Sequence, residues 1–331
     1  MSSAPLTSSA PLTSSTPLNL AFVMDPPQTI DVSADTTFAL MLEAQSRGHR
    51  ILYIDPGDLA IWDKRVRALV RPLTLRKDPG RPVDLGDPEW VFLDDTVDVA
   101  FQRVDPPVDA AYIYATQILS LCERTQVYNR PEAVLSSNEK LYTLHFPELM
   151  PDTVVTRDAT QILEFMEKMG GEAVVKPLDG RGGEGIFHIH LKDRNLNSIL
   201  EQSTRFGTRR AMAQRFLPEV HEGDKRILLL EGELLGAVLR VPAESEIRAN
   251  LHVGGRAARA EIDARDREII ERLGPRLRED GLFFVGIDVI GGFLTEVNVT
   301  SPTGIQEMGR FDGNSYEATV IDRVESRSSR S

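Results

Sequence analysis

The chain has 331 residues, of which 41% are hydrophobic, and a formal net charge of -12. Such a length usually makes two or three globular domains with large cores, and the acidic balance argues against a nucleic-acid partner. No apolar run approaches the ~20 residues of a spanning helix, so we expect no membrane segment. The single cysteine, Cys122, excludes an intramolecular disulfide and fits a cytoplasmic protein.

The amino-terminal part is expected to be a tail followed by a domain built on a parallel sheet. Residues 2–18 repeat SSAPLT, SSAPLT and SSTPLN, a composition typical of a disordered tail. Strand, helix and strand patterns follow at Leu20–Met24, Asp35–Gln45 and Arg50–Asp55, which favours a parallel sheet covered by helices. Loops at the strand ends of such sheets often hold ligands. Arg103, just before an Asp-Pro-Pro turn, is therefore a candidate for substrate contact, with ordinary turn chemistry as the alternative.

A glycine-rich segment follows a strand that carries a lysine. The strand Ala173–Pro177 places Lys176 in an apolar run, where a lysine is costly to bury unless an anion neutralises it. The next residues, Asp179–Gly185, match G-x-G-x-x-G, but a strand pattern follows where a dinucleotide fingerprint requires a helix. The segment is better interpreted as a hairpin whose backbone N–H groups cover phosphates, with a mobile surface turn as the alternative. The order of motifs excludes a protein kinase, and no P-loop sequence occurs.

The second half contains further strands, a long loop and a charged helix. Arg226 and Arg240 fall at strand ends, where guanidinium groups can bind phosphate or carboxylate. Residues 242–260 read as a loop without structure, either an active-site lid or disorder. After a helix at Ile262–Glu279 and the following hairpin, the chain beyond Phe311 is expected to fray.

The six histidines show no metal-binding spacing. His188 and His190 alternate on one strand face without a third partner in the sequence, so they are interpreted as ordinary surface residues.

The segment Phe283–Gly304 is the strongest functional signal. Two β-rich runs flank Gly291-Gly292 and predict a hairpin. Glu296 and Asn298 share a face of the second strand, and Asp288 joins them only if a three-residue turn pairs positions 288 and 296. Two carboxylates and an amide suit Mg²⁺, which prefers oxygen ligands. A solvated polar strand face is the alternative.

Long motifs in this order resemble the ATP-grasp superfamily and, within it, bacterial glutathione synthetases. They are NEK at Asn138–Lys140, KPLDGRGGEGIF from Lys176, MAQRFLP from Met212, GDKR from Gly223, and VGIDVIG with LTEVNVTSPTG up to Gly304. The resemblance implies an α/β and α+β architecture, an ATP-grasp fold preceded by a Rossmann-like domain. The implied divisions are a tail at 1–18, a substrate domain at 19–137, a lobe with the glycine lid at 138–213, a lobe with the metal site at 214–322, and a frayed tail at 323–331.

The resemblance also implies ATP-dependent ligation of glycine to γ-glutamylcysteine through an acyl phosphate, with two Mg²⁺ ions, or Mn²⁺ in their place. The implied metal ligands are Asp288, Glu296 and Asn298. The implied nucleotide-binding residues are Lys140, Lys176, Gly182, Gly183, Gln214, Arg215, Phe216, Leu217 and Asp224. The implied catalytic residues are Arg226, Arg240, Arg248 and Asn250, and the implied substrate-binding residues are Arg103, Ser301, Pro302 and Thr303.

Two departures from the family pattern leave alternatives open. Val104 and Ala249 stand where the family usually has other residues, in segments expected to bind the peptide. Another carboxylate–amine ligase of the superfamily, one that adds glutamate or joins D-alanine, is the first alternative. A nucleotide sensor without turnover is the second. A homotetramer is what the family resemblance implies, and no residue pattern demands it.

Overall fold

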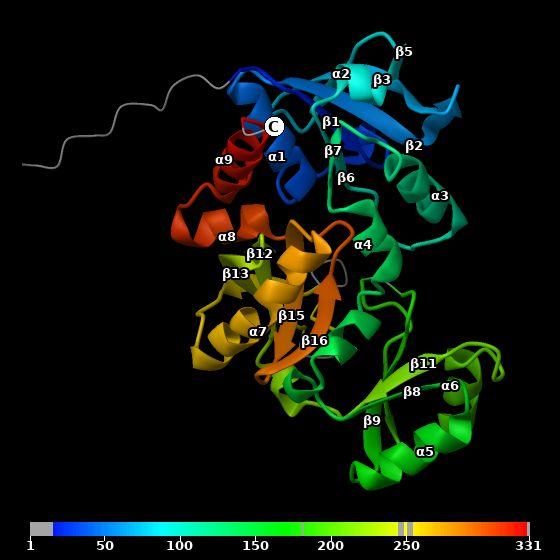
Figure 1. Ribbon diagram of the computed structural model, residues 1–331. Helices are drawn as coiled ribbons and strands as arrows, with labels where there is room; N and C mark the ends of the chain where they lie inside the picture. The colour runs from blue at the N-terminus through cyan, green and yellow to red at the C-terminus, as the bar shows by residue number, and fades with distance from the viewer. Residues whose placement is uncertain (1–15, 181, 244–247, 250–253, 330–331) are drawn as a thin grey trace, which may run out of the picture.

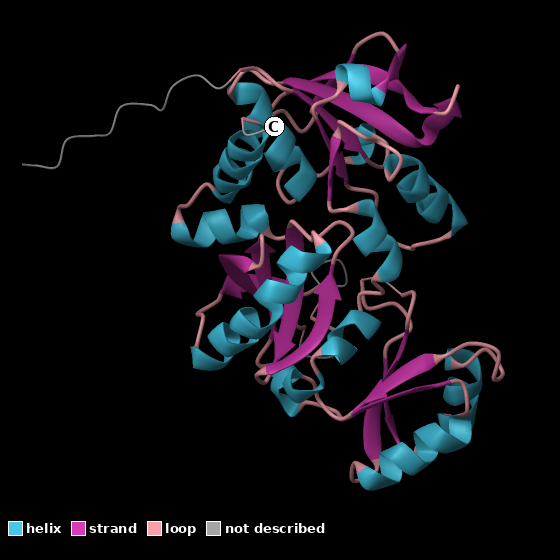
Figure 2. Ribbon diagram, in the orientation of Figure 1, coloured by secondary structure: helices cyan, strands magenta, loops and turns pink. Residues whose placement is uncertain are grey.

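The computed structural model describes residues 16–180, 182–243, 248–249 and 254–329. Within these ranges the strands form three sheets, each with helices packed against it (Figures 1 and 2). The first sheet belongs to residues 19–128, the second to residues 153–214, and the third to residues 224–298. None of the described helices is both long and apolar enough to cross a membrane.

The first sheet confirms the predicted parallel core. Its parallel strands are β1 (Asn19–Val23), β2 (Arg50–Trp62), β6 (Val99–Gln102) and β7 (Gln126–Tyr128). The antiparallel strands β3 (Arg65–Leu75), β4 (Val83–Leu85) and β5 (Glu89–Phe92) extend one edge. The expected strand end at Asp55 is wrong: β2 continues to Trp62, with a register shift between Ile54 and Leu59 that absorbs the Pro-Gly pair. The main helices of this domain are α1 (Thr36–Ser46) and α3 (Ala110–Leu119).

The second sheet forms a small lobe at the lower right of Figure 1. It has the order β10 (Phe187–His190), β9 (Glu172–Pro177), β11 (Ala211–Gln214) and β8 (Thr153–Thr156). Helices α5 (Ala159–Lys168) and α6 (Leu196–Ser203) cover one face, where Ala173, Val175 and Ile189 are buried. Side chains alternate along a strand, so Lys176 must point to the opposite face.

The third sheet is antiparallel and has the order β14 (Arg256–Arg259), β13 (Glu233–Val241), β12 (Asp224–Leu230), β15 (Phe284–Ile290) and β16 (Phe293–Asn298). Helix α7 (Ala264–Asp280) covers one face. An Asp263 capping box starts this helix and Gly281, in the left-handed region, ends it. The prediction of a loop without structure over residues 242–260 is wrong for its last part, because Arg256–Arg259 form β14 and pair with β13.

The predicted pairing of Asp288 with Glu296 is confirmed, but by a different turn. Ile290 pairs with Phe293, so Gly291 and Gly292 form a two-residue turn. A register shift then occurs between Asp288 and Val289, which brings Asp288 opposite Glu296. A β-bulge thus aligns Asp288 with Glu296, whereas we had predicted that a three-residue turn would align them.

The carboxyl-terminal segment corrects the expectation of a frayed tail. Helices α8 (Ile305–Asp312) and α9 (Tyr316–Ser328) follow the third sheet, and α9 packs beside α1 (Figure 1). Val320, Ile321 and Val324 are buried, and Arg47 pairs with Asp322 and Glu325. The short helices are α2 (Leu93–Thr96), α4 (Pro131–Ser136), η1 (Pro27–Thr29), η2 (Leu141–His145), η3 (Pro147–Leu149) and η4 (Pro218–His221).

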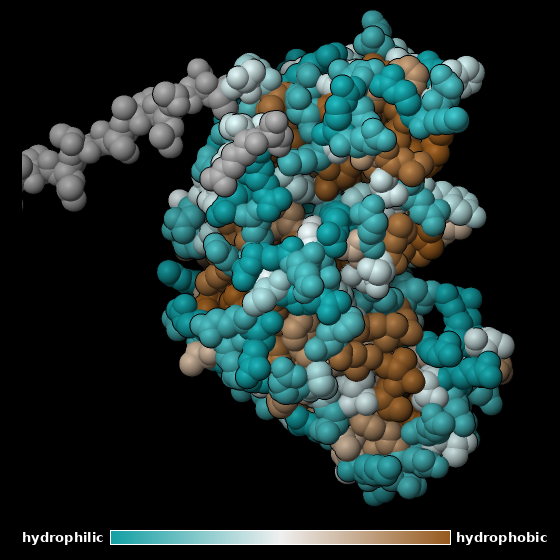
Figure 3. Space-filling model, viewed as in Figure 1, coloured by the Kyte–Doolittle hydropathy of each residue, from teal (hydrophilic) through white to brown (hydrophobic). Residues whose placement is uncertain are grey.

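The surface is mostly hydrophilic in the view of Figure 3. Hydrophobic side chains in this view gather where the small lobe meets the rest of the molecule. The cavity described next is lined by residues of the small lobe, the third sheet and the amino-terminal domain.

Candidate functional site

One face of the third sheet carries the charged residues. Ile227 and Leu229 pack in the same core as α7, so their neighbours on β12 point to the other face. Cross-strand pairing places Arg226 opposite Asp288 and Asp224 opposite Arg240. The strand register therefore gathers four buried charges on the face that lines the cavity.

Asp288 is held by two arginines. Arg226 donates through Nε to Oδ1 at 2.5 Å and through Nη2 to Oδ2 at 3.0 Å, while Arg240 Nη2 lies 3.0 Å from Oδ2. Burial favours the neutral acid, but the two guanidinium groups outweigh it and hold the pKa of Asp288 well below its usual range. Asp288 is therefore an anion at neutral pH, with both oxygens already in contact with arginine.

Asp224 shares Arg240 with Asp288. Arg240 Nη2 donates to Asp224 Oδ2 at 2.5 Å, and Asp224 Oδ1 has no hydrogen-bond partner among the described residues. Burial raises the pKa of the Asp224 carboxyl to about 6, against the opposing effect of Arg240. The two neighbouring carboxyl groups thus differ: the pKa of Asp224 is close to neutral pH, whereas Asp288 is ionised there.

Lys140 connects three segments. Its Nζ donates to Glu296 Oε1 at 2.9 Å and to the Gly180 carbonyl at 2.9 Å. Burial disfavours the charge, but Glu296 outweighs it, so the pKa of Lys140 is raised. Lys140 is the residue that immediately precedes the short helix η2.

Lys176 is buried on the face of the small lobe that points into the cavity. Its Nζ donates to the Thr295 carbonyl at 3.3 Å. Burial lowers the pKa of Lys176 to about 8. An anion in the cavity would favour the charged form of Lys176, which agrees with the expectation that a buried lysine here faces an anion.

The glycine-rich segment lies over the same cavity. Gly182 and Gly183 have φ angles of 59° and 86°, in the region that favours glycine. Gly180, Gly182 and Gly183 line the cavity, whereas Arg181 lies outside the described residues. Backbone groups can therefore approach a ligand here without side chains in between.

The segment after β11 supplies another wall, formed by Gln214, Arg215, Phe216 and Leu217. The Arg215 N–H donates to the Asp152 carbonyl at 2.9 Å, so this amide is already used within the protein. The Arg215 guanidinium lies 5.0 Å from the centre of the Phe293 ring. This wall therefore combines backbone polar groups with apolar side chains, which suits a planar aromatic ring of a ligand.

The amino-terminal domain closes one side of the cavity through Arg103. This buried guanidinium donates to Thr37 Oγ1 at 3.0 Å and to the Pro302 carbonyl at 2.9 Å. Ser301 and Thr303 line the cavity, whereas Pro302 is buried and is not among the lining residues. The Pro302 carbonyl thus helps to fix Arg103, and a contact between Pro302 and substrate stays a prediction.

The 242–260 segment is described only in part. Arg248 and Ala249 line the cavity. Asn250, expected to be catalytic, lies outside the described residues.

Glu139, within the NEK motif, belongs to the site but was not predicted from the sequence. Its buried carboxylate accepts hydrogen bonds from Thr300 Oγ1 at 2.9 Å and from the Val299 and Thr300 amides. Burial, together with Glu296, raises the pKa of Glu139. This carboxylate fixes the end of β16 beside Lys140, and an acidic residue next to a predicted phosphate lysine was the available signal.

The cavity has a volume of about 880 Å³ and brings the predicted groups together. Its lining includes Arg103, Lys140, Lys176, Gly182, Gly183, Gln214, Arg215, Phe216, Leu217, Asp224, Arg226, Arg240, Arg248, Asp288, Glu296, Asn298, Ser301 and Thr303. Oxygen donors, lysines and a glycine-rich segment in one cavity form a site that can hold a metal-bound polyphosphate.

Comparison with protein families gives two matches that together span most of the chain. Residues 18–134 match the family described as prokaryotic glutathione synthetase, N-terminal domain. Residues 139–313 match prokaryotic glutathione synthetase, ATP-grasp domain.

Curated relatives agree with these matches. The glutathione synthetase of Gloeobacter violaceus is 48% identical over 311 residues, covering 92% of this chain and 95% of the relative. The glutathione synthetase of Agrobacterium fabrum is 44% identical over 310 residues, covering 93% and 97%.

Solved structures support the fold alone. The D-cycloserine synthetase DcsG matches with a TM-score of 0.63 at 12% identity, covering 93% of this chain and 99% of that chain. A RimK domain ATP-grasp protein from Sphaerobacter thermophilus matches with a TM-score of 0.60 at 18% identity, covering 92% and 98%.

Proposed function

Because the chain belongs to the prokaryotic glutathione synthetase family, an ATP-grasp family of carboxylate–amine ligases, we propose that the cavity joins glycine to γ-glutamylcysteine while ATP becomes ADP and phosphate. The observation that carries this proposal is the convergence of Lys140, Lys176, Asp288, Glu296 and the glycine-rich segment on one cavity. The choice of substrates rests on family membership, and the residues of the cavity suit the chemistry.

We propose that Lys140 and Lys176 bind the phosphates of ATP. Glu296 stabilises the charged form of Lys140, whereas a bound anion would raise the lowered pKa of Lys176. Gly182 and Gly183 would cover the phosphates and limit the access of water. Gln214 to Leu217 would hold the adenine, with the amides and carbonyls beyond Arg215 as the polar contacts.

The donor set fits Mg²⁺, the ion implied by the family, and Mn²⁺ would accept the same ligands. Glu296 and Asn298 would hold it, and Asp288 would join if one arginine contact loosened, since both its oxygens are in contact with arginine. When bound, the ion supplies charge neutralisation at the phosphates.

The acyl transfer requires a carboxylate oxygen of γ-glutamylcysteine to bond to the γ-phosphorus of ATP as the bond to ADP breaks. The glycine nitrogen then bonds to the activated carbonyl carbon, phosphate leaves, and the amine loses its protons to water or phosphate. Arg226 and Arg240, which donate hydrogen bonds to Asp288 and Asp224, would neutralise the charge of the transferring phosphoryl group. Arg103, Arg248, Ser301 and Thr303 would bind the peptide and glycine, and Asn250 is proposed for the same site from the sequence alone.

Phosphate release, measured with each substrate omitted in turn, tests this function. We expect release that requires γ-glutamylcysteine and glycine together, and glutathione detected by mass spectrometry. Release that does not depend on glycine would contradict the assignment. Release with glutamate or D-alanine instead would favour another ligase of the superfamily, and no release with any amine would favour a nucleotide sensor.

We further propose a cytoplasmic location and a homotetramer. The use of ATP and the single cysteine support the first. Light scattering tests the second: a mass near that of one chain would refute it.

A further inference from the structure

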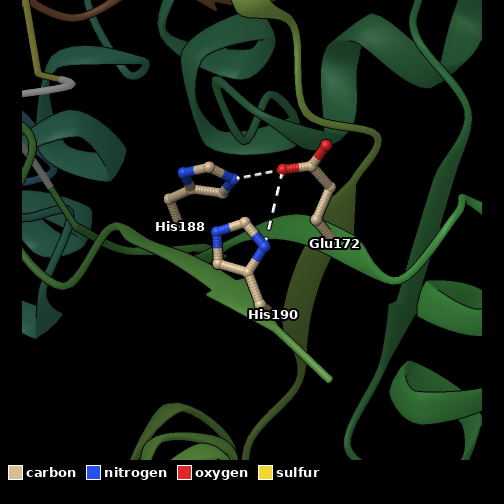
Figure 4. A group of neighbouring side chains, drawn as sticks. All are labelled: Glu172, His188 and His190. Carbon is tan, nitrogen blue, oxygen red and sulfur yellow. Dashed lines mark hydrogen bonds and ion pairs between the residues drawn. The ribbon is translucent and has the colours of Figure 1, made fainter. Parts of the chain in front are cut away.

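A cluster of two imidazoles and a carboxylate lies on the small lobe, outside the residues used above. His188 Nε2 lies 2.8 Å from Glu172 Oε2, and His190 Nδ1 lies 3.7 Å from the same oxygen (Figure 4). The three ligand atoms all lie within 4.8 Å of one another. This arrangement corrects our expectation that the histidines lack a third partner: Glu172 supplies it from the neighbouring strand.

Strand geometry places these side chains together. β9 and β10 are antiparallel, with His190 opposite Glu172 and His188 opposite Val174. Ile189, between the two histidines, is fully buried beneath α5 and α6, so both imidazoles must point to the other face. β10 is also the edge strand of its sheet, which leaves the cluster open to solvent.

The ring of His188 is held in place by a further contact. It stacks on Phe216 with ring centres 3.8 Å apart and an angle of 12° between the planes. The His188 and Glu172 side chains are 19% and 38% exposed, so an ion can reach them without rearrangement of the core. His190, at 55%, is the most accessible of the three.

We propose that Glu172, His188 and His190 bind one divalent transition-metal ion of the Zn²⁺ class. Two imidazole nitrogens and one carboxylate oxygen are a donor set of open zinc sites, which keep water as the fourth ligand. Ligands of a tetrahedral zinc ion are about 3.3 Å apart, which follows from bond lengths of about 2.0 Å, and the spacings of 2.8 and 3.7 Å bracket this value. Mg²⁺ is a poor occupant because it prefers oxygen ligands.

Calorimetric titration of Zn²⁺ into chelator-treated protein tests the site, with a large excess of Mg²⁺ present to occupy the carboxylates of the cavity. We expect one Zn²⁺ per chain, and binding weakened at least about tenfold by Glu172→Gln or by His190→Gln. His145→Gln, which changes an exposed histidine far from the cluster in sequence, is the matched control and should bind as the unaltered chain does.

A spectroscopic readout does not depend on the folding of any variant. Co²⁺ added to the unaltered chain should give the intense visible absorption of four-coordinate cobalt, and Zn²⁺ should displace it. Absence of stoichiometric Zn²⁺ binding would overturn the proposal. Equal binding by the Glu172→Gln, His190→Gln and unaltered chains would overturn it as well. Neither outcome bears on ligase activity, so the proposed function is tested separately.

Discussion

Replacing Asp288 with asparagine should destabilise the chain through the arginines left behind. Asp288 is 3% exposed, and Arg226 and Arg240 both contact it. The variant keeps the side-chain volume, but it removes the carboxylate that pairs with Arg226 and leaves Arg240 paired with Asp224. Removing one partner of a buried ion pair costs about 3 to 5 kcal/mol. With an unfolding entropy of about 2.1 cal/mol/K per residue, this cost lowers the melting temperature by roughly 4 to 7 °C for 331 residues.

Scanning calorimetry of the nucleotide-free chain measures this effect. Asp95→Asn is the matched control, because Asp95 also pairs with two arginines but on the surface, and it should change the melting temperature little. The Asp288 pKa is depressed, so its contribution is present above the ordinary value of 3.8 and is lost as the pH falls through the folded value. The difference in melting temperature between the Asp288→Asn variant and the unaltered chain should therefore narrow below about pH 4. Equal melting temperatures for the Asp288 variant and the unaltered chain at pH 7 would refute the reasoning.

Three further predictions concern other parts of the molecule. Glu296→Gln should reduce turnover strongly at limiting Mg²⁺ while circular dichroism stays unchanged; full activity there would remove Glu296 from the metal site. Lys176 is charged below a pKa of about 8, so ATP affinity should fall as the pH rises through that value, and Lys176→Met should abolish this dependence; a variant that keeps it would exclude Lys176 as the cause. Ile321→Ala should cost about 2 to 5 kcal/mol in urea unfolding, because Ile321 is fully buried. Thr319→Ala, on the exposed side of α9, is its control, and equal losses would show that α9 does not dock.

The sequence was informative where a residue type is needed by the chemistry. Lys176 in an apolar strand, followed by glycines, predicted an anion site, and the cavity contains both. The hairpin residues were also found, although a bulge and not a longer turn aligns Asp288 with Glu296. A register shift depends on packing across the sheet, so the local sequence around Gly291 does not determine it.

Other features depend on contacts between residues far apart in the sequence. Helix α9 has only a narrow apolar face, Val320, Ile321 and Val324, among arginines and serines, and it resembled a tail until α1 was placed beside it. Glu172 lies 16 residues from His188, so only strand pairing reveals the cluster. The pairing of Asp288 with two arginines likewise follows from the order of β13, β12 and β15 in the sheet.

The docking of α9 on α1 has a consequence for the synthesis of the protein. Helix α1 leaves the ribosome long before α9, the helix that packs beside it. Arg47 and His49 therefore cannot pair with Asp322 and Glu325 until α9 has been synthesised. Nascent chains that stop short of residue 316 should leave this surface of α1 exposed to chaperones and proteases.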